Sequence, residues 1–329
     1  MTQPPMIFAL NSSREFAEQV TTELSLSLSP HEEREFDDGE HKSRPEVSVR
    51  NRDVFVIQSL YSDPTASVND KLIRLLYFVG ALRDASAATV TAVIPYLAYA
   101  RKDQKSQPRD PVTTRYVAEL IEAVGANRVV TLDVHNLAAF QNAFRINTDH
   151  LTAMSVFARH FARELSDQPR ITVVSPDFGG TKRAERFRSN LEGRIGRTVN
   201  SGFMEKERAL GRMSAGRLVG EVEQSTVLIF DDLISTGGTI AAAAHACRDQ
   251  GARRVYAVAT HGLFVGKASE VLAGDDIDGA VITDTVQPIR LDSQIRDRKL
   301  TVLSTASLFA EAIRRIHEGG SLVDLLAAT

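Results

Sequence analysis

The feature that most constrains the fold is an alternation of short, β-branched apolar runs with helix-length segments along the chain. The apolar runs have the length of buried strands, and the segments between them space their apolar residues as a helix does. The expected strands are Met6–Leu10, Asp53–Gln58, Thr89–Pro95, Arg128–Val134, Ile171–Ser175, Thr226–Phe230, Arg254–Thr260, Ala280–Thr283 and Leu300–Leu303. The expected helices cover residues 12–24, 69–84, 112–125, 151–165, 180–190, 239–250, 266–273 and 306–317. Strand–helix alternation of this kind predicts an α/β fold with mainly parallel sheets flanked by helices.

Helix and domain boundaries follow from the same pattern. Asn11 and Ser12 are expected to cap the first helix. The chain has 329 residues, which is too long for one ordinary core and suits two domains of about 150 residues. We expect a first domain over residues 1–150 and a second over residues 151–305. A terminal helix over residues 306–325 is expected to pack back on the first domain.

Composition excludes several classes of protein. Hydrophobic residues are 43% and charged residues 25%, which excludes disordered, collagen-like and coiled-coil chains. The 39 basic and 42 acidic side chains give a formal net charge of −3, so we expect no nucleic-acid partner. No apolar run reaches the roughly 20 residues of a membrane helix, and Met1–Leu10 lacks the features of a secretory signal. A single cysteine, Cys247, fits a reducing compartment, so we expect a cytoplasmic protein without membrane contact.

The segment with the most specific chemistry is Val227–Thr239, in which an apolar strand runs into Asp231 and Asp232 and then into a turn of small residues. In a parallel α/β sheet such a turn lies at the carboxyl end of a strand, where ligands bind. Glycines let the backbone approach an anion, and the following helix directs its free N–H groups there. The turn therefore predicts a phosphate site, and its residues are Ser235, Thr236, Gly237, Gly238 and Thr239.

The paired carboxylates Asp231 and Asp232 do not suit a phosphate, because like charges repel. They suit sugar hydroxyls, or a metal ion carried by the substrate. The structural alternative is a tight turn after an acidic strand end. A lysine-containing phosphate loop is excluded, because no Gly-Lys-Ser/Thr sequence follows.

The acidic strand end and its Thr-Gly-Gly-Thr turn look like the ribose-phosphate loop of type I phosphoribosyltransferases, and the chain as a whole resembles the ribose-phosphate pyrophosphokinase family. The matching motifs extend over nearly the whole chain: Phe36–Glu40, Val93–Arg101, Asp133–His135, Ser175–Gly180, Thr260–Phe264 and Glu311–His317. The resemblance implies two tandem type I phosphoribosyltransferase-like domains. It also implies an enzyme that transfers diphosphate from Mg-ATP to the 1-hydroxyl of ribose 5-phosphate. The products are phosphoribosyl diphosphate, for nucleotide biosynthesis, and AMP.

The resemblance assigns the residues that bind the two substrates. Asp231 and Asp232 hold the ribose hydroxyls, and the turn Ser235–Thr239 holds the 5-phosphate. In family members the segment matching Phe36 reaches the adenine of a neighbouring subunit, which implies a homo-oligomer, a dimer or larger, with a shared active site. Lys102 stands where the family usually has Gln. The residues assigned to ATP are Phe36, Asp38, Glu40, Arg101, Lys102 and His135.

Mg²⁺ is the implied cofactor, and His135 and Asp177 are the residues placed around it. Asp177 is the better direct ligand, because magnesium prefers oxygen. His135 contacts the metal, its water or a phosphate oxygen, unless it is a structural imidazole. Lys206 and Arg208 are two residues apart, so their side chains share one face of an extended segment. The resemblance makes this pair catalytic, whereas the residues alone favour a solvated charged strand, because glutamates alternate with them.

Two other functions remain open. A non-catalytic regulatory subunit associated with a synthetase should have lost part of the catalytic set, which this chain retains. A phosphoribosyltransferase would consume phosphoribosyl diphosphate and would not need the ATP-binding residues Arg101 and Phe36–Glu40. Release of AMP from ATP separates both alternatives from the synthetase.

Overall fold

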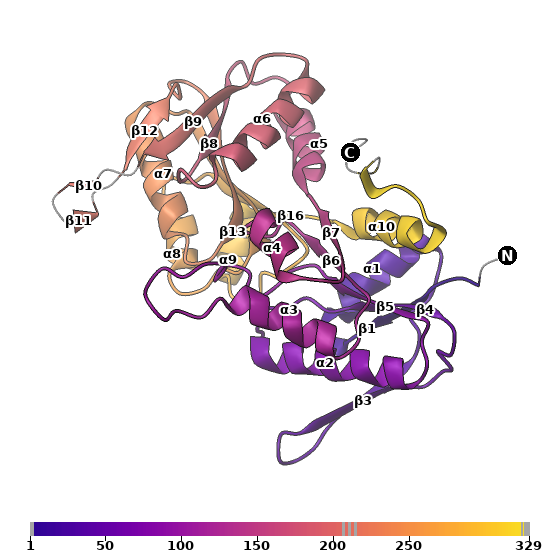
Figure 1. Ribbon diagram of the computed structural model, residues 1–329. Coiled ribbons are helices and arrows are strands. Elements are labelled where there is room, and N and C mark those ends of the chain that lie inside the picture. Colours follow the sequence, from indigo (N-terminus) through magenta and orange to yellow (C-terminus); the bar gives the residue numbers. More distant parts are fainter. Residues whose placement is uncertain (1–2, 206–207, 210–211, 214–215, 324, 326–329) are drawn as a thin grey trace. The chain divides into compact units, whose positions relative to one another are not determined.

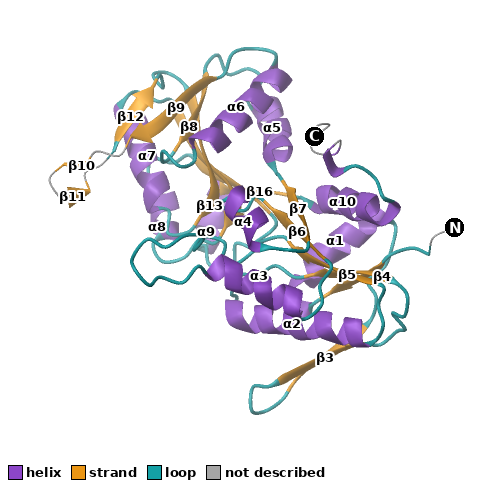
Figure 2. Ribbon diagram, in the orientation of Figure 1, coloured by secondary structure: helices purple, strands orange, loops and turns teal. Residues whose placement is uncertain are grey.

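Figure 1 shows the computed structural model of the chain, which describes residues 3–205, 208–209, 212–213, 216–323 and 325. The chain divides into two units. Unit 1 comprises Met1–Thr152 and Thr305–Thr329, and unit 2 comprises Ala153–Ser304. Each unit has its own sheet flanked by helices (Figure 2), which confirms the predicted α/β fold. Among the described residues, no helix combines the length and the hydrophobicity needed to cross a membrane.

Unit 1 is built on a five-stranded sheet in which every strand pairing is parallel. The order of strands in the sheet follows their order in the chain: β1 (Met6–Ala9), β4 (Asp53–Ile57), β5 (Thr89–Ile94), β6 (Arg128–Leu132) and β7 (Asn147–Leu151). Because the strands are parallel, their carboxyl ends share one edge of the sheet. The loops that follow β5 and β6 both leave from that edge.

The helices of unit 1 bury the sheet. They are α1 (Arg14–Leu24), α2 (Val68–Asp84), α3 (Thr113–Ala123), α4 (Leu137–Ala143) and α10 (Ala306–Glu318), with a 3₁₀ turn η1 (Asn11–Ser13) before α1. Ser67 and Asp70 form a reciprocal capping box that opens α2. Leu75 and Phe78 of this helix belong to the same buried cluster as Val54 of β4.

The C-terminal segment belongs to unit 1 and packs against its first helix. Phe309 of α10 meets Phe16 of α1 edge to face, with 5.4 Å between ring centroids. His317 Nδ1 lies 2.7 Å from Asp53 Oδ2 at the start of β4, a contact between residues 264 positions apart.

A polar hairpin of unit 1 extends beyond the helices in Figure 1. Its antiparallel strands are β2 (His31–Glu35) and β3 (His41–Pro45). Arg74 of α2 holds the hairpin through Glu35, with 3.0 Å between Nη2 and Oε2, and Tyr77 stacks on His41 at 5.4 Å. The sequence pattern did not predict this hairpin, because its strands carry charged side chains instead of an apolar run.

Unit 2 contains a seven-stranded sheet in which only β12 is antiparallel to its neighbour. The sheet order is β12-β9-β8-β13-β14-β15-β16. The chain therefore runs outward from β8 to β9 and then returns to place β13 on the other side of β8. The strands are β8 (Ile171–Ser175), β9 (Asn200–Glu205), β12 (Arg217–Gly220), β13 (Thr226–Ile234), β14 (Arg254–Gly262), β15 (Gly279–Thr283) and β16 (Leu300–Leu303), beside a two-stranded pair, β10 (Arg208–Ala209) and β11 (Arg212–Met213).

The two faces of the unit 2 sheet are packed differently. Phe187 and Phe230 stack at 4.3 Å on one face, and Phe157 meets Phe230 edge to face at 5.7 Å. Side chains alternate along β13, so Ile229 faces the other way and belongs to the cluster that contains the buried Cys247. The helices are α5 (Met154–Glu164), α6 (Thr181–Ile195), α7 (Gly238–Asp249), α8 (Ala268–Ala273) and α9 (Ser293–Lys299).

Three expectations about local structure were wrong. β13 does not end at Phe230 but continues through both aspartates to Ile234, because the equally long β14 pairs with it there. Neither Asn11 nor Ser12 caps α1; Ser13 precedes that helix and makes no side-chain capping bond. The chain after β6 does not pass directly into a helix near residue 151, because α4 and β7 come first.

Candidate functional site

The acidic motif lies where the strand order of unit 2 reverses. β8 and β13 are parallel neighbours, with Val174 opposite Ile229. In an open parallel sheet, ligands bind outside the carboxyl ends of the strands at such a reversal. Asp177 follows β8, and Asp231 with Asp232 lies at the end of β13. The structure thus places these predicted residues at one edge of one sheet.

The turn after β13 has the backbone of an anion cradle. Gly237 precedes α7 with φ of 80°, which favours glycine, and a Cβ there would lie in tight contact with Val271 Cγ1, at 3.1 Å. The first N–H groups of α7, from Gly238 and Thr239 onward, have no intrahelical partner and carry the positive end of the helix dipole. Ser235 O accepts a 2.9 Å hydrogen bond from Val265 N–H, which holds the turn in place. An anion can therefore bind here.

Asp231 and Asp232 are linked by a cation that the sequence pattern did not single out. Arg183 Nη1 of α6 lies 2.9 Å from Asp231 Oδ1 and 2.7 Å from Asp232 Oδ1. The Asp232 side chain is 5% exposed and that of Asp231 20%. Burial and the neighbouring Asp232 carboxylate raise the pKa of Asp231 to about 8. The signal that points to such an arginine is the motif itself, because two adjacent carboxylates at a buried strand end need a counter-ion.

The loop after β8 fixes one oxygen of Asp177. Gly180 N–H donates to Asp177 Oδ1 at 2.8 Å, and Ser175 Oγ donates to Asp177 O at 2.7 Å. No described residue is recorded as a hydrogen-bond partner of Asp177 Oδ2. Nowhere in the described part of the chain do three or more His, Cys, Asp or Glu side chains gather as a metal cage. One carboxylate of this kind fits a magnesium ion that takes most of its ligands from substrate phosphates and water.

The predicted ATP residues Phe36, Asp38 and Glu40 lie at the tip of the β2–β3 hairpin. Phe36 N–H donates to Glu40 O at 2.8 Å, and Glu40 N–H donates to Asp38 Oδ1 at 3.1 Å. The Phe36 ring is 39% exposed, with the Arg34 guanidinium 5.1 Å from its centroid. The hairpin thus presents an exposed aromatic face beside acidic side chains.

Arg101 and His135 are exposed on the loops that follow β5 and β6. Asn136 Nδ2 donates to Asp103 Oδ2 at 2.6 Å and joins these two loops. The structure therefore brings together the segments that contain Arg101 and His135, at the carboxyl edge of the unit 1 sheet.

Lys102, on the first of these loops, contacts residues of its own loop. Its Nζ lies 2.5 Å from Asp110 Oδ2 and 2.6 Å from Ser106 Oγ. The hydrogen bond from Lys102 lowers the pKa of Asp110 to about 2. A ligand that recruits this ammonium group must share it with Asp110.

The predicted catalytic pair falls in the least described part of the chain. Lys206 lies outside the described residues. Arg208 begins β10, and its side chain lies outside the description.

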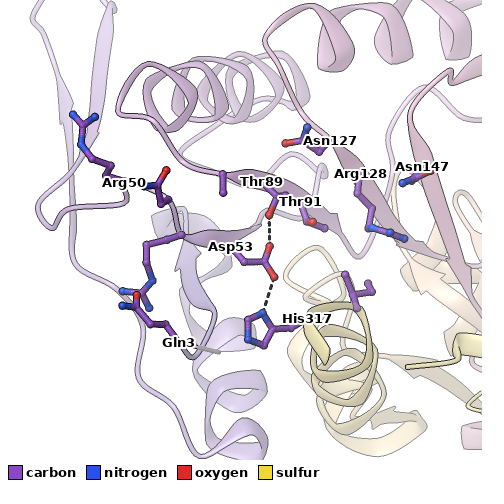
Figure 3. A pocket seen from close by; sticks show the side chains of 13 residues that line it. Gln3, Arg50, Asp53, Thr89, Thr91, Asn127, Arg128, Asn147 and His317 are labelled. Carbon is purple, nitrogen blue, oxygen red and sulfur yellow. Dashed lines mark hydrogen bonds and ion pairs between the residues drawn. The ribbon is translucent and has the colours of Figure 1, made fainter. Parts of the chain in front are cut away.

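Unit 1 also contains a cavity of about 670 Å³ at the opposite, amino-terminal edge of its sheet (Figure 3). Asp53 Oδ2 lies 2.7 Å from His317 Nδ1 in this cavity, and Thr89 donates to the other oxygen of Asp53. Arg128 is paired with Asp149, and Arg52 Nη2 donates to a backbone carbonyl at 2.7 Å. None of the predicted site residues lines this cavity.

Comparison with known proteins gives a consistent result. Residues 5–125 match the model of the N-terminal domain of ribose phosphate pyrophosphokinase, and residues 203–327 match the phosphoribosyl synthetase-associated domain. A ribose-phosphate pyrophosphokinase of Caldanaerobacter subterraneus subsp. tengcongensis is 42% identical over 97% of this chain and 96% of the relative. One of Fusobacterium nucleatum is 40% identical over 97% of each chain. The crystal structure of phosphoribosylpyrophosphate synthetase from Mycobacterium smegmatis is similar, with a TM-score of 0.85 and 35% identity over 97% of this chain and 100% of that one.

Proposed function

The chain belongs to the ribose-phosphate pyrophosphokinase family, and on that premise we propose that it is an active ribose-phosphate diphosphokinase. It transfers the diphosphate group of Mg-ATP to the 1-hydroxyl of ribose 5-phosphate. The products are AMP and phosphoribosyl diphosphate, a precursor for nucleotide biosynthesis. Use of ATP and a free cysteine thiol favour the cytoplasm as its location.

The observation that carries this proposal is the pairing of an acidic strand end with an anion cradle at the strand reversal of unit 2. Asp231 and Asp232 accept hydrogen bonds from the ribose hydroxyls. The turn Ser235–Thr239 and the first N–H groups of α7 hold the 5-phosphate. One ligand that carries hydroxyls and a phosphate a few ångströms apart satisfies both groups.

Unit 1 supplies the residues for ATP in this proposal. Phe36 stacks on adenine, while Asp38 and Glu40 accept from the base or its ribose. Arg101, Lys102 and His135 bind the phosphates. Because the hairpin that carries Phe36 extends away from its own helices, we propose that it serves the active site of a neighbouring copy in a homo-oligomer.

Mg²⁺ supplies charge neutralisation to the ATP phosphates when it is bound. The groups of this chain that would hold it are the Asp177 carboxylate and, directly or through water, the His135 imidazole. Gly180 N–H donates to Asp177 Oδ1 and so fixes the orientation of the carboxylate that would hold the metal. Carboxylates that ligate metals commonly accept a hydrogen bond of this kind from the surrounding protein.

The reaction needs no protein nucleophile. The 1-hydroxyl attacks the β-phosphorus, the bond from this phosphorus to the α–β bridging oxygen breaks, and AMP leaves. The protein's contributions are alignment of the two substrates and stabilisation of negative charge on the moving group and on AMP. We assign the second contribution to Lys206 and Arg208.

The test is AMP release from Mg-ATP by the purified protein, with and without ribose 5-phosphate, together with detection of phosphoribosyl diphosphate. AMP that appears only with the sugar phosphate, one for one with product, supports the synthetase. No AMP, with tight association to another synthetase chain, would instead establish the regulatory subunit.

The catalytic assignment has its own test in Lys206→Ala. We expect kcat to fall by about 100- to 1000-fold, because a charge-stabilising group is lost from the transition state. Affinity for ribose 5-phosphate should change by less than about 3-fold. Arg115→Ala, which removes an exposed cation of α3 paired with Glu119, is the control and should leave both quantities unchanged. Equal losses in kcat and in affinity would contradict the assignment.

A further inference from the structure

Arg183 is the one basic side chain that the structure records in contact with both proposed ribose-binding carboxylates, among the residues it describes. It lies in the first turns of α6, the helix that follows the Asp177 loop. The same nitrogen, Nη1, contacts both Asp231 and Asp232, so one guanidinium group holds the two carboxylates close together. Its side chain is 19% exposed, which places the ion triad largely out of water.

The contacts of Asp231 leave one of its oxygens for a ligand. Oδ1 accepts from Arg183 Nη1 and from the Asp232 N–H, at 2.9 Å and 2.8 Å. The Asp231 carboxyl also interacts with the side chain of Asp232. Among the described residues, no backbone or arginine donor to Oδ2 is recorded, and the side chain is 20% exposed. The guanidinium and the backbone N–H together fix the carboxylate plane. Oδ2 then points in a fixed direction and can accept from an incoming hydroxyl.

The charge of Arg183 matters as much as its position. The charged groups that the structure sets against Asp231 are Asp232 on its own strand and Arg183 on α6. Burial and Asp232 raise the pKa of Asp231, and Arg183 opposes both effects. A carboxylate accepts hydrogen bonds from hydroxyls better when it is ionised, because a protonated carboxyl has given up acceptor capacity. Without the arginine, the pKa of the pair would rise further, because the cation that opposes burial and the neighbouring charge would be missing.

We propose that Arg183 is a positioning residue for ribose 5-phosphate, whose shared guanidinium orients the carboxyl groups of Asp231 and Asp232 to accept the ribose hydroxyls. This inference rests on the proposed function, because it concerns the same site. In this proposal Arg183 does not contact the sugar but acts on it only through the two carboxylates.

The experiment titrates ribose 5-phosphate into the full chain by calorimetry, without ATP or metal. We expect Arg183→Gln to weaken binding by about 30-fold, because a buried charge pair is left unpaired. Arg183→Lys should recover part of the loss, since an ammonium supplies the charge without the planar geometry. Arg188→Gln is the matched control. Arg188 lies on the same helix with 18% exposure and also pairs with two carboxylates, and its loss should not change the affinity.

Two further readouts separate positioning from a general structural role. Between pH 7 and pH 10, above the second ionisation of a phosphate near pH 6, affinity should rise with pH. In Arg183→Gln this rise should move to higher pH, because the pKa of the carboxylate pair increases. The double variant Arg183→Gln with Asp231→Asn should bind more weakly than Asp231→Asn alone, but by less than the full effect of Arg183→Gln, because only Asp232 is left for the arginine to orient. It also leaves one uncompensated carboxylate instead of two if the single variant folds poorly.

The inference is overturned if Arg183→Gln binds as the wild type does, or if its loss adds in full to that of Asp231→Asn. It is also overturned if Arg183→Gln binds more tightly, since the guanidinium would then occupy the ligand's place. A wild-type chain that neither binds ribose 5-phosphate nor releases AMP would instead contradict the proposed function.

Discussion

Units 1 and 2 share a parallel α/β architecture but differ in the order of their strands. In unit 1 the order in the sheet follows the chain, whereas in unit 2 the chain reverses between β8 and β13. The reversal collects Asp177, Arg183 and the two aspartates of β13 at one edge of a single sheet. In unit 1 the proposed ligand residues lie on a hairpin and on two loops. The proposed site residues of unit 2 therefore lie along one edge of its sheet. Those of unit 1 lie on a hairpin and on loops outside its sheet.

The buried ion pairs of the two units also differ in what they do. In unit 1, Lys71 has no exposed surface; its Nζ lies 2.6 Å from Asp63 and 4.0 Å from the centre of the Tyr61 ring. This pair lies within the fold and outside the proposed site. In unit 2, Arg183 bridges two carboxylates that we propose to bind the ribose hydroxyls. The comparison suggests that a buried charge serves stability in the first case and recognition in the second.

Among the substitutions that compare the two units, the largest effect is expected for Asp232→Asn in unit 2. The change removes an acceptor for a ribose hydroxyl and leaves Arg183 with one carboxylate, so kcat/KM for ribose 5-phosphate should fall by about 100-fold. The KM for ATP should stay within about 3-fold of the wild-type value if unit 1 alone binds it. Steady-state AMP release with each substrate varied in turn measures both. A large change in the KM for ATP would contradict the proposal that the two units bind different substrates.

The next effect is expected for Lys71→Met in unit 1. Breaking the pair should cost about 2–3 kcal/mol of unfolding free energy, less than for a fully buried pair because Asp63 keeps its bonds from Thr65. Affinity for ribose 5-phosphate should not change. Lys42→Met, which removes an exposed cation paired with Glu32 at 3.6 Å, should cost less than about 0.5 kcal/mol. Chemical denaturation distinguishes the two variants, and equal losses would contradict the role given to Lys71.

The same pair predicts a pH dependence of stability. Burial of Asp63 acts to raise its pKa, but hydrogen bonds from Lys71 and Thr65 prevail and lower it to about 2. A carboxyl group with a lowered pKa stabilises the fold fully above its unfolded pKa of about 3.9 and loses that contribution as the pH falls toward 2. In Lys71→Met the loss of stability between pH 4 and pH 2 should be smaller than in the wild type. An unchanged acid profile would show that Lys71 does not stabilise the Asp63 carboxylate.

A smaller effect is expected for Phe36→Ala on the hairpin. Loss of stacking on adenine should raise the KM for ATP by about 10-fold, since an aromatic–base stack is worth roughly 1–3 kcal/mol. The KM for ribose 5-phosphate should not change. Tyr116→Ala is the control, because Tyr116 is an aromatic side chain that is 50% exposed on α3, outside the hairpin. Equal effects of the two variants on ATP would argue against a role for the hairpin tip.

The last prediction concerns the reactivity of Cys247 in unit 2 and needs no substitution. Burial raises the pKa of its thiol to about 12, so a thiol-exchange reagent at pH 8 should react roughly 1000-fold more slowly than with a free thiol of pKa about 8.5. The rate with the folded chain is compared with that in guanidinium chloride, where the thiol is exposed. Fast reaction of the folded protein would mean that α7 moves away from the sheet often enough to expose Cys247. That result would contradict a rigid site in unit 2.

The α/β class, most strand positions and the acidic motif with its glycine turn could all be predicted from the amino-acid sequence. Periodicity and turn chemistry are local, so a short window of residues carries them. The polar β2–β3 hairpin was not predicted, because its strands contain no apolar run. The extension of β13 through Asp231 and Asp232 was not predicted either, because pairing with β14 overrides the turn-like composition of that segment.

Tertiary structure alone decided which distant residues meet. Arg183 lies 48 positions from Asp231, and His317 lies 264 positions from Asp53. No local pattern encodes such contacts, because they depend on the order in which strands join a sheet. The reversal that places β8 beside β13 likewise depends on the order in which the strands join the sheet. The proposed site residues can therefore be predicted from the sequence, whereas their contact with Arg183 is seen only in the folded structure.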